Sequence, residues 1–241
     1  ATAATTQAGM SAPRGLAYDD VNQRLYVSQA AINRVTTYDV AAITNGENAI
    51  NVLGQATFTA ATAANTQAGM NDPRGVTYDG TNSRLYVAQG TANRVTVYDV
   101  ATITDGEGAN NVIGQPSFTI TTSGISRNNL SFPIGVLADP AHSRLYVLDS
   151  SNNRLLMFDL TVTIANGLNA NNVLGQTTFT ATTAASTLAG MNTPRGLAYD
   201  SANQRLYVSQ TTGNRVTTYD VAAITDGENA INVLGQANFT T

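Results

Sequence analysis

The feature that most constrains this chain is a repeat of about sixty residues that occurs four times. Each copy contains Arg-Leu-Tyr-Val, at residues 24–27, 84–87, 144–147 and 205–208, so the copies are spaced by 60, 60 and 61 residues. Each copy opens on Pro-x-Gly, continues with Asn-Arg and an aromatic-Asp pair, and closes on Val-Leu/Ile-Gly-Gln. Such a period indicates an array of equivalent structural units. We expect one domain, 1–241, with repeats at about 1–60, 61–120, 121–181 and 182–241.

The first repeat predicts four short strands. They are Gly15–Tyr18, Arg24–Ser28, Arg34–Val40 and Asn51–Gln55, each rich in β-branched or aromatic residues and bounded by Asp-, Asn- or Gly-containing turns. Four strands per unit, joined by tight turns, are typical of a propeller blade. A solenoid is the rival interpretation, but its units are usually shorter and carry fewer strands. We therefore expect an all-β fold, a four-bladed β-propeller of four-stranded antiparallel blades.

The repeated motifs resemble NHL repeats over the whole chain. The resemblance implies a propeller and says little about activity, since propellers host many functions. NHL-like propellers more often have six blades than four, which leaves the closure of the ring open. Four units could close as a compact ring, or two chains could form a larger one. No strand is visibly left over to lock the ring, so closure would come from packing of the fourth blade on the first or from a neighbouring molecule.

Composition excludes several classes of function. Charged residues make up 12% of the chain, all twelve basic residues are arginine, and the net charge is −4. A nucleic-acid partner needs a basic face and so does a polybasic membrane-surface protein, so we expect neither. No apolar run is long enough for a transmembrane helix, and we expect no membrane insertion.

The chain has no cysteine, which excludes disulfides and thiolate metal sites. It begins at Ala1 without a methionine or a signal-like stretch, as a mature or trimmed form would. A surface without lysine and rich in threonine and asparagine is typical of extracellular proteins. We therefore expect a secreted or cell-surface location.

Three arginines form the candidate ligand-binding site. Arg14, Arg74 and Arg195 stand between the proline and the glycine that open the first strand of their repeats, while the third repeat has Ile134 there. In propellers this strand lines the central channel, so these side chains could form an arginine collar at its mouth. Guanidinium groups bind carboxylates and phosphates bidentately, which suggests an anion or an acidic glycan as ligand. The alternative is that each arginine pairs with an acidic neighbour or is solvated.

Catalytic chemistry is poorly supplied. Some NHL-like propellers are lyases or hydrolases with a metal held by channel histidines and carboxylates, but the one histidine, His142, lies in a predicted turn. No nucleophile elbow, phosphate loop or metal-spaced histidine pair is present. Asp19 and its copies are expected to cap turns, and Arg24 and Arg34 with their copies to pair with Asp19 and Asp39 and theirs. We predict no catalytic residue, no metal and no cofactor.

Two hypotheses of function remain. The first is a non-enzymatic extracellular structural or interaction propeller that assembles with itself into an oligomer or filament, or binds other extracellular proteins or glycans. Its basis is the missing catalytic machinery and a surface poor in lysine and glutamate, a composition that resembles interfaces. The second is a ligand-binding or lyase-type propeller that acts on an anionic or glycan ligand at the channel mouth.

Overall fold

Each repeat folds into one four-stranded antiparallel sheet, which we call a blade. The computed structural model describes residues 4–240. Blade 1 contains β1 (Pro13–Asp19), β2 (Arg24–Gln29), β3 (Arg34–Asp39) and β4 (Asn51–Leu53), hydrogen-bonded in chain order. The four predicted strands of the first repeat are confirmed, with ends that differ by one or two residues.

The other three blades repeat this plan in the same strand order. Blade 2 contains β5 (Pro73–Asp79), β6 (Arg84–Gln89), β7 (Arg94–Asp99) and β8 (Asn111–Ile113); blade 3 contains β9 (Pro133–Asp139), β10 (Arg144–Asp149), β11 (Arg154–Asp159) and β12 (Asn172–Leu174); blade 4 contains β13 (Pro194–Asp200), β14 (Arg205–Gln210), β15 (Arg215–Asp220) and β16 (Asn232–Leu234).

Helical structure among the described residues consists of three short 3-10 turns: η1 (Ala30–Ile32), η2 (Pro140–His142) and η3 (Ser150–Asn152). None of them is long enough to cross a membrane.

The predicted turn caps are confirmed in the first hairpin of each of three blades. The Asp19 carboxylate accepts hydrogen bonds from the backbone N–H groups of Val21 and Asn22, both at 3.1 Å, and Asp79 and Asp200 repeat this arrangement. In blade 3 a proline follows Asp139, and the carboxylate instead contacts His142 Nδ1 at 2.9 Å. The hairpins therefore keep one register although this turn differs in blade 3.

The hydrophobic core lies between blades. Each interior blade presents one apolar face to the blade before it, here called the leading face, and one to the blade after it, the trailing face. Between blades 1 and 2 the trailing face of blade 1 meets the leading face of blade 2 around Met70 of the linker. Equivalent clusters fill the junctions between blades 2 and 3 and between blades 3 and 4. In the interior blades the second and third strands, β6, β7, β10 and β11, each bury all but one residue.

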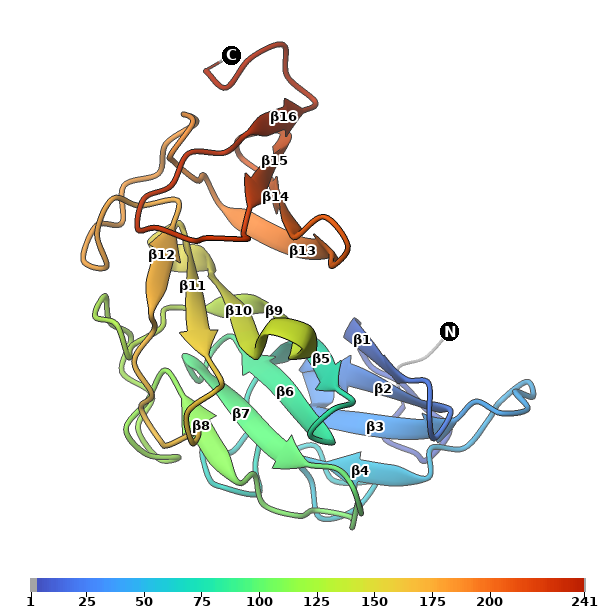
Figure 1. Cartoon of the computed structure of the whole chain (residues 1–241). Coiled ribbons are helices and arrows are strands. Elements are labelled where there is room, and N and C mark those ends of the chain that lie inside the picture. The colour runs from blue at the N-terminus through green and yellow to red at the C-terminus, as the bar shows by residue number, and fades with distance from the viewer. Residues whose placement is uncertain (1–3, 241) are drawn as a thin grey trace.

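The blades form an open arc (Figure 1). The first strand of each blade lies on the inside, with β1 packed beside β5, β5 beside β9, and β9 beside β13. Backbones approach closely at Gly15 and Gly75: a Cβ at Gly75 would lie 2.7 Å from the carbonyl oxygen of Ile134. Within residues 4–240 no comparable packing joins β13 to β1, and Figure 1 shows blade 4 and blade 1 at the two ends of the arc.

The opening begins at the junction between blades 3 and 4. A Cβ at Gly135 would meet the side chain of Leu148 in its own blade rather than the backbone of β13. Leu148 stands where the other blades have Ser28, Ala88 and Ser209. This larger side chain is buried in the junction and fills the space in which, at the other junctions, the next inner strand lies.

Candidate functional site

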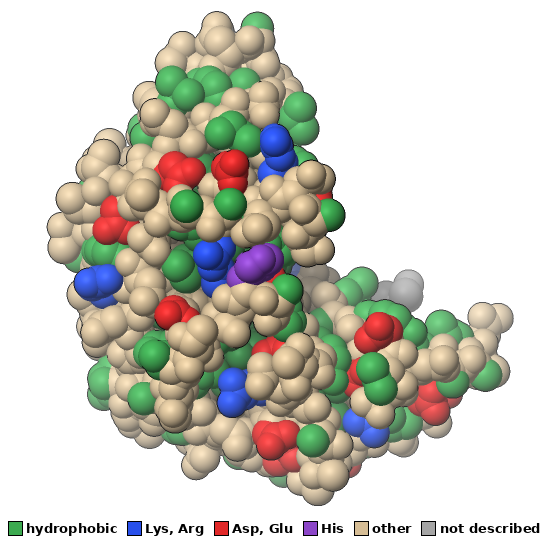
Figure 2. Space-filling model, viewed as in Figure 1, with side chains coloured by type: hydrophobic (Ala, Val, Ile, Leu, Met, Phe, Trp, Pro, Cys, Tyr) green, Lys and Arg blue, Asp and Glu red, His purple; other side chains and the backbone are tan. Residues whose placement is uncertain are grey.

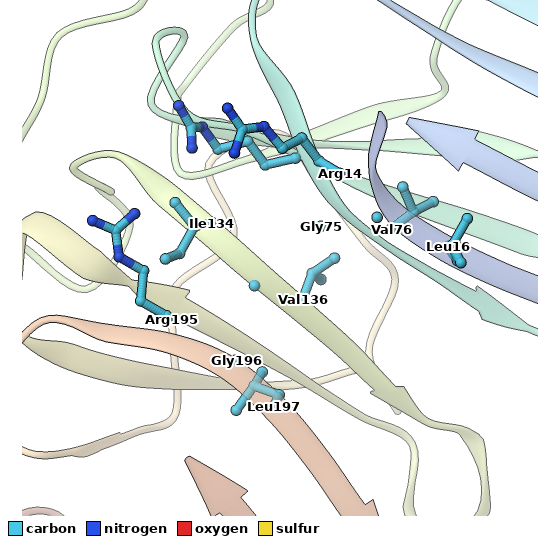
Figure 3. Close-up of a pocket in the computed structure, with 12 residues that line it drawn as sticks. Arg14, Leu16, Gly75, Val76, Ile134, Val136, Arg195, Gly196 and Leu197 are labelled. Atoms are coloured by element: carbon cyan, nitrogen blue, oxygen red, sulfur yellow. The ribbon is translucent and has the colours of Figure 1, made fainter. Parts of the chain in front are cut away.

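The arginine collar and the inner strands line one cavity. Arg14, Arg74 and Arg195 lie on the inner strands of blades 1, 2 and 4, and with Ile134 of blade 3 they border a cavity of about 360 Å³. Figure 3 shows Arg14, Ile134 and Arg195 at one end of this cavity, and Leu16, Val136 and Leu197 at the other. Three of the four inner strands therefore carry an arginine at the same mouth, the third blade carries Ile134 there, and all four have an aliphatic residue deeper along the cavity.

The three arginines differ in their surroundings. Arg74 Nε donates to the Asp72 carboxylate at 2.8 Å, and its guanidinium lies 4.4 Å from the centre of the Phe132 ring. Arg14 and Arg195 are exposed, and among the described residues neither forms an ion pair. Asp72 has no acidic counterpart in the other repeats, where Ala12, Phe132 and Thr193 stand. The alternative of local pairing thus holds for Arg74, while Arg14 and Arg195 present free guanidinium groups to the cavity.

The lining of this cavity contains no carboxylate and no histidine. Over residues 4–240 no group of three or more His, Asp or Glu side chains is placed to hold a metal ion. His142 lies outside the cavity in η2, with its Nδ1 against Asp139, as the sequence predicted for a turn residue. The arrangement can bind an anion through two free guanidinium groups and the backbone of the inner strands.

The apolar surfaces at the two ends of the arc are a second set of candidate binding surfaces. On the leading face of blade 1, Leu16 is 64% exposed and Met10 of the preceding linker 39%, whereas the equivalent Val76 and Met70 are 6% and 0% exposed. On the trailing face of blade 4, Leu234 is 57% exposed, and its equivalents Leu53, Ile113 and Leu174 are at most 1% exposed. Both ends therefore expose apolar positions that the interior junctions cover.

Figure 2 shows that charged side chains are few on the face in view. Acidic and basic side chains lie singly over a largely uncharged polar surface, and the molecule is hollowed on the side between the two arms of the arc. The charged residues, whose sum gives the net charge of −4, are likewise scattered along the sequence. The face in view therefore carries no large block of like charge.

One set of interior residues was wrongly interpreted from the sequence. Arg34 and its copies were predicted to pair with the aspartates that end the third strand, but Arg34, Arg94, Arg154 and Arg215 are all buried and bind elsewhere. Arg94 donates to the carbonyl oxygens of Phe118, Thr66 and Gly69, so that one guanidinium holds the linkers before and after its blade. The recurrence of Asn-Arg in every repeat marks the position of these arginines, but it does not identify their partners, which are mostly backbone carbonyls.

Comparison with known proteins identifies the fold. No protein-family model matches the chain, and no curated protein matches it in sequence. A chain in the crystal structure of a nidogen/laminin complex is similar over 94% of this chain, with a TM-score of 0.62 and 16% sequence identity. The chain spans 65% of the length of that protein chain. At this identity the likeness concerns the fold, and with the four blades it confirms the predicted all-β, four-bladed propeller architecture; membership of the NHL family stays a prediction.

Proposed function

We propose that this chain is a non-enzymatic structural or interaction propeller that assembles with itself, outside the cell, into an oligomer or filament. The observation that carries the proposal is the pair of apolar end faces. Burying one exposed leucine is worth about 1.5–3 kcal/mol, so a contact that covered both Leu16 and Leu234 would supply a substantial driving force. Soluble monomers seldom leave such surfaces uncovered.

Further features support the same function. The cavity lining offers arginine, glycine and aliphatic side chains and no general acid, base or nucleophile pair. The similar chain comes from a complex of two proteins, nidogen and laminin, which fits a protein-binding role. The lysine-free, weakly charged surface supports the extracellular location.

Light scattering across a range of protein concentrations, with negative-stain microscopy, tests this function. We expect the mass to rise with concentration, and the variants Leu16→Asp and Leu234→Asp to lower it, because each places a carboxylate on an end face. The control is Val162→Asp, at a residue that is 51% exposed on a loop of blade 3. A single-chain mass at every concentration would contradict self-assembly.

The arginine cavity supports a second candidate function, a ligand-binding or lyase-type propeller for an anionic or glycan ligand. Its basis is that Arg14, Arg74 and Arg195 line one cavity although they lie far apart in the sequence. Titration with a sulfated oligosaccharide should show binding that the double variant Arg14→Ala/Arg195→Ala loses. Arg24→Ala/Arg205→Ala removes the same charge elsewhere and should bind as the wild type does; equal affinity of the two double variants would exclude the site.

A further inference from the structure

The two end faces are copies of the two sides of a junction that already exists inside the chain. On the trailing side, blade 1 contributes Ala, Tyr, Val and Leu, and blade 4 carries the same four residues at the equivalent positions. These are Ala17, Tyr26, Val35 and Leu53 in blade 1, and Ala198, Tyr207, Val216 and Leu234 in blade 4. The free trailing face of blade 4 is therefore chemically identical to one that packs on a next blade.

The leading side repeats in the same way. Blade 2 contributes Val76, Leu85, Val87, Tyr98, Val100 and Ala109 to its junction with blade 1, and blade 1 carries Leu16, Leu25, Val27, Tyr38, Val40 and Ala49 at these positions. The one difference is Leu16 for Val76. Blade 4 shows that leucine fits, because Leu197 stands there and packs against the junction between blades 3 and 4.

Every junction also contains one pair of hydrogen bonds between a loop and the last strand of the preceding blade. At the first junction Val52 N donates to Asp105 Oδ1 at 3.1 Å, and Gly106 N donates back to the Val52 carbonyl at 2.9 Å. Asn166 with Gly167 and Asp226 with Gly227 make the same pair with Val112 and Val173. An asparagine therefore serves as acceptor as well as an aspartate does.

The two partners of a fourth such hydrogen-bond pair lie at opposite ends of the arc. Asn45-Gly46 occupies the loop position in blade 1, and Val233 occupies the strand position in blade 4. A Cβ at Gly46 would have nothing within 4 Å, whereas one at Gly106 would lie 2.9 Å from the Cα of Ala56 in the preceding blade. The loop of blade 1 thus has the conformation of its copies, with a φ of +77° at Gly46 against +71° at Gly106, but no strand beside it.

The linker residue that fills each junction also has a counterpart at the ends of the arc. A Cβ at Gly54 would lie 2.5 Å from Cγ of Met70, and Met191 and Leu130 fill the same place beside Gly175 and Gly114. The space at Gly235 is bounded only by its own blade, with Asn214 O at 3.1 Å. Met10 is the residue of this kind that precedes blade 1, and it is 39% exposed.

We propose that the trailing face of blade 4 binds the leading face of blade 1 of a second copy of this chain, in the register of the internal junctions. In this contact Asn45 accepts from Val233 N, Gly46 N donates to the Val233 carbonyl, and Met10 packs on Gly235. The inference rests on the proposed self-assembly and specifies its surface and its partner. Because the contact joins two different faces, it closes into a ring or continues as a filament.

Cross-linking of mixed single-cysteine variants tests the contact. Asn51 Nδ2 lies 3.3 Å from Asp105 Oδ1 across the first junction, and Asn232 and Asn45 are the equivalent residues at the two ends. The chain has no cysteine, so Asn45→Cys and Asn232→Cys each carry one thiol. After mild oxidation the mixture should form reducible covalent dimers, several-fold more than either variant alone, and Asn51→Cys/Asp105→Cys should form the control disulfide within one chain.

The double variant Asn45→Cys/Asn232→Cys separates a second copy from closure within one chain. Head-to-tail binding predicts a ladder of covalent multimers on a non-reducing gel. An internal disulfide in a single chain would overturn the proposal, since it would mean that blade 4 closes on blade 1 of the same molecule. Equal cross-linking of each single variant with itself would overturn it as well.

A substitution at Gly46 tests the register without disturbing the fold. Gly46→Asn tolerates the positive φ, and its side chain meets nothing in the free chain. In the assembly it would collide with the backbone at Ala237, the equivalent of Ala56, so we expect single chains at concentrations where the wild type associates. Gly80→Asn, in an exposed turn of blade 2, is the control. If the wild type associates and Gly46→Asn associates equally, this contact is wrong while self-assembly stands; if the wild type never associates, self-assembly itself is wrong.

Discussion

The third repeat differs from the others at the position five residues before each buried arginine, and hydrogen bonding explains the difference. Gln29, Gln89 and Gln210 stand there in blades 1, 2 and 4, and each donates through Nε2 to a threonine hydroxyl. Blade 3 has Leu156 in place of that threonine and Asp149 in place of the glutamine. Leu156 offers no hydrogen-bond acceptor, and an aspartate carboxylate has no N–H that needs one, so Asp149 can lie beside it. Asp149 accepts from Ser131 N, Asn152 Nδ2 and Arg154 Nε.

Replacing Asp149 with glutamine should therefore destabilise the protein. The amide of Asp149→Gln would place a buried N–H beside Leu156 with no acceptor, at a cost of about 1–3 kcal/mol in the free energy of unfolding. Adding Leu156→Thr supplies the hydroxyl found in the other blades and should recover part of this loss. Urea unfolding of the two single variants and the double variant measures the coupling, and additive effects would contradict the explanation.

Buried tyrosines give the stability a dependence on alkaline pH. Burial raises the pKa of Tyr86 and of Tyr98 to about 12, from 10.0. The folded state then holds these phenolic protons between pH 10 and 12 while the unfolded chain releases them, so the contribution of the two tyrosines to the free energy of unfolding is constant below that window and falls as pH rises through it. In an alkaline titration, the part of the phenolate absorbance that comes from the buried tyrosines should rise in the same transition in which the circular dichroism of the fold is lost. Ionisation of all tyrosines before any unfolding would contradict this.

At the scale of the element, the asparagine before β3 both turns the chain and joins two blades. Asn93 has a φ of +52°, its Oδ1 accepts from Phe132 N at 2.8 Å, and its Nδ2 donates to Thr121 O at 2.8 Å. Asn33 and Asn153 make the same two bonds toward the blade that follows. Asn214 has the same positive φ but belongs to blade 4, which no blade follows within the chain.

Because only Asn93 bonds to a following blade, replacement by alanine should lower the free energy of unfolding more at Asn93 than at Asn214. Asn93→Ala loses two bonds at about 0.5–1.5 kcal/mol each and places alanine at positive φ for about 1 kcal/mol more, a total of about 2–4 kcal/mol. Asn214→Ala incurs only the backbone strain, about 1 kcal/mol. Chemical unfolding of both variants under the same conditions measures the difference. Equal losses would mean that the asparagine acts in the turn alone.

The strands could be predicted from the sequence because each signal is local and is repeated four times. The predicted fourth strand, Asn51–Gln55, is too long by two residues, since Gly54 has a φ of +83° and ends it. The partners of the buried arginines could not be predicted, because most of them are backbone carbonyls of linkers about 25 residues away, and a backbone acceptor leaves no mark in the sequence. The arginine cavity was predicted as a set of residues, but the pairing of Arg74 with Asp72 depends on an aspartate that one repeat alone carries.

At the scale of the whole molecule, the sequence does not predict whether the four blades close into a ring or form an open arc. Closure depends on the sum of the rotations between successive blades, and each rotation follows from packing within a junction, as at Leu148. The repeat pattern is nearly the same whether the array closes or stays open. An open array of repeats is stabilised by its neighbours, so its terminal units are stabilised least.

Hydrogen exchange should reveal this gradient, and the chain provides its own control. β4 and β16 have the same sequence, Asn-Val-Leu, flanked on both sides by the same residues, so their intrinsic exchange rates match. Val52 and Leu53 are fully buried under blade 2, whereas Leu234 is 57% exposed. At low concentration the amides of Asn232–Leu234 should exchange much faster than those of Asn51–Leu53, because blade 4 opens without displacing a following blade. Raising the concentration should slow exchange at β16 and at the loop around Gly46 together, since one contact covers both; equal exchange of β4 and β16 at low concentration would contradict the open arc.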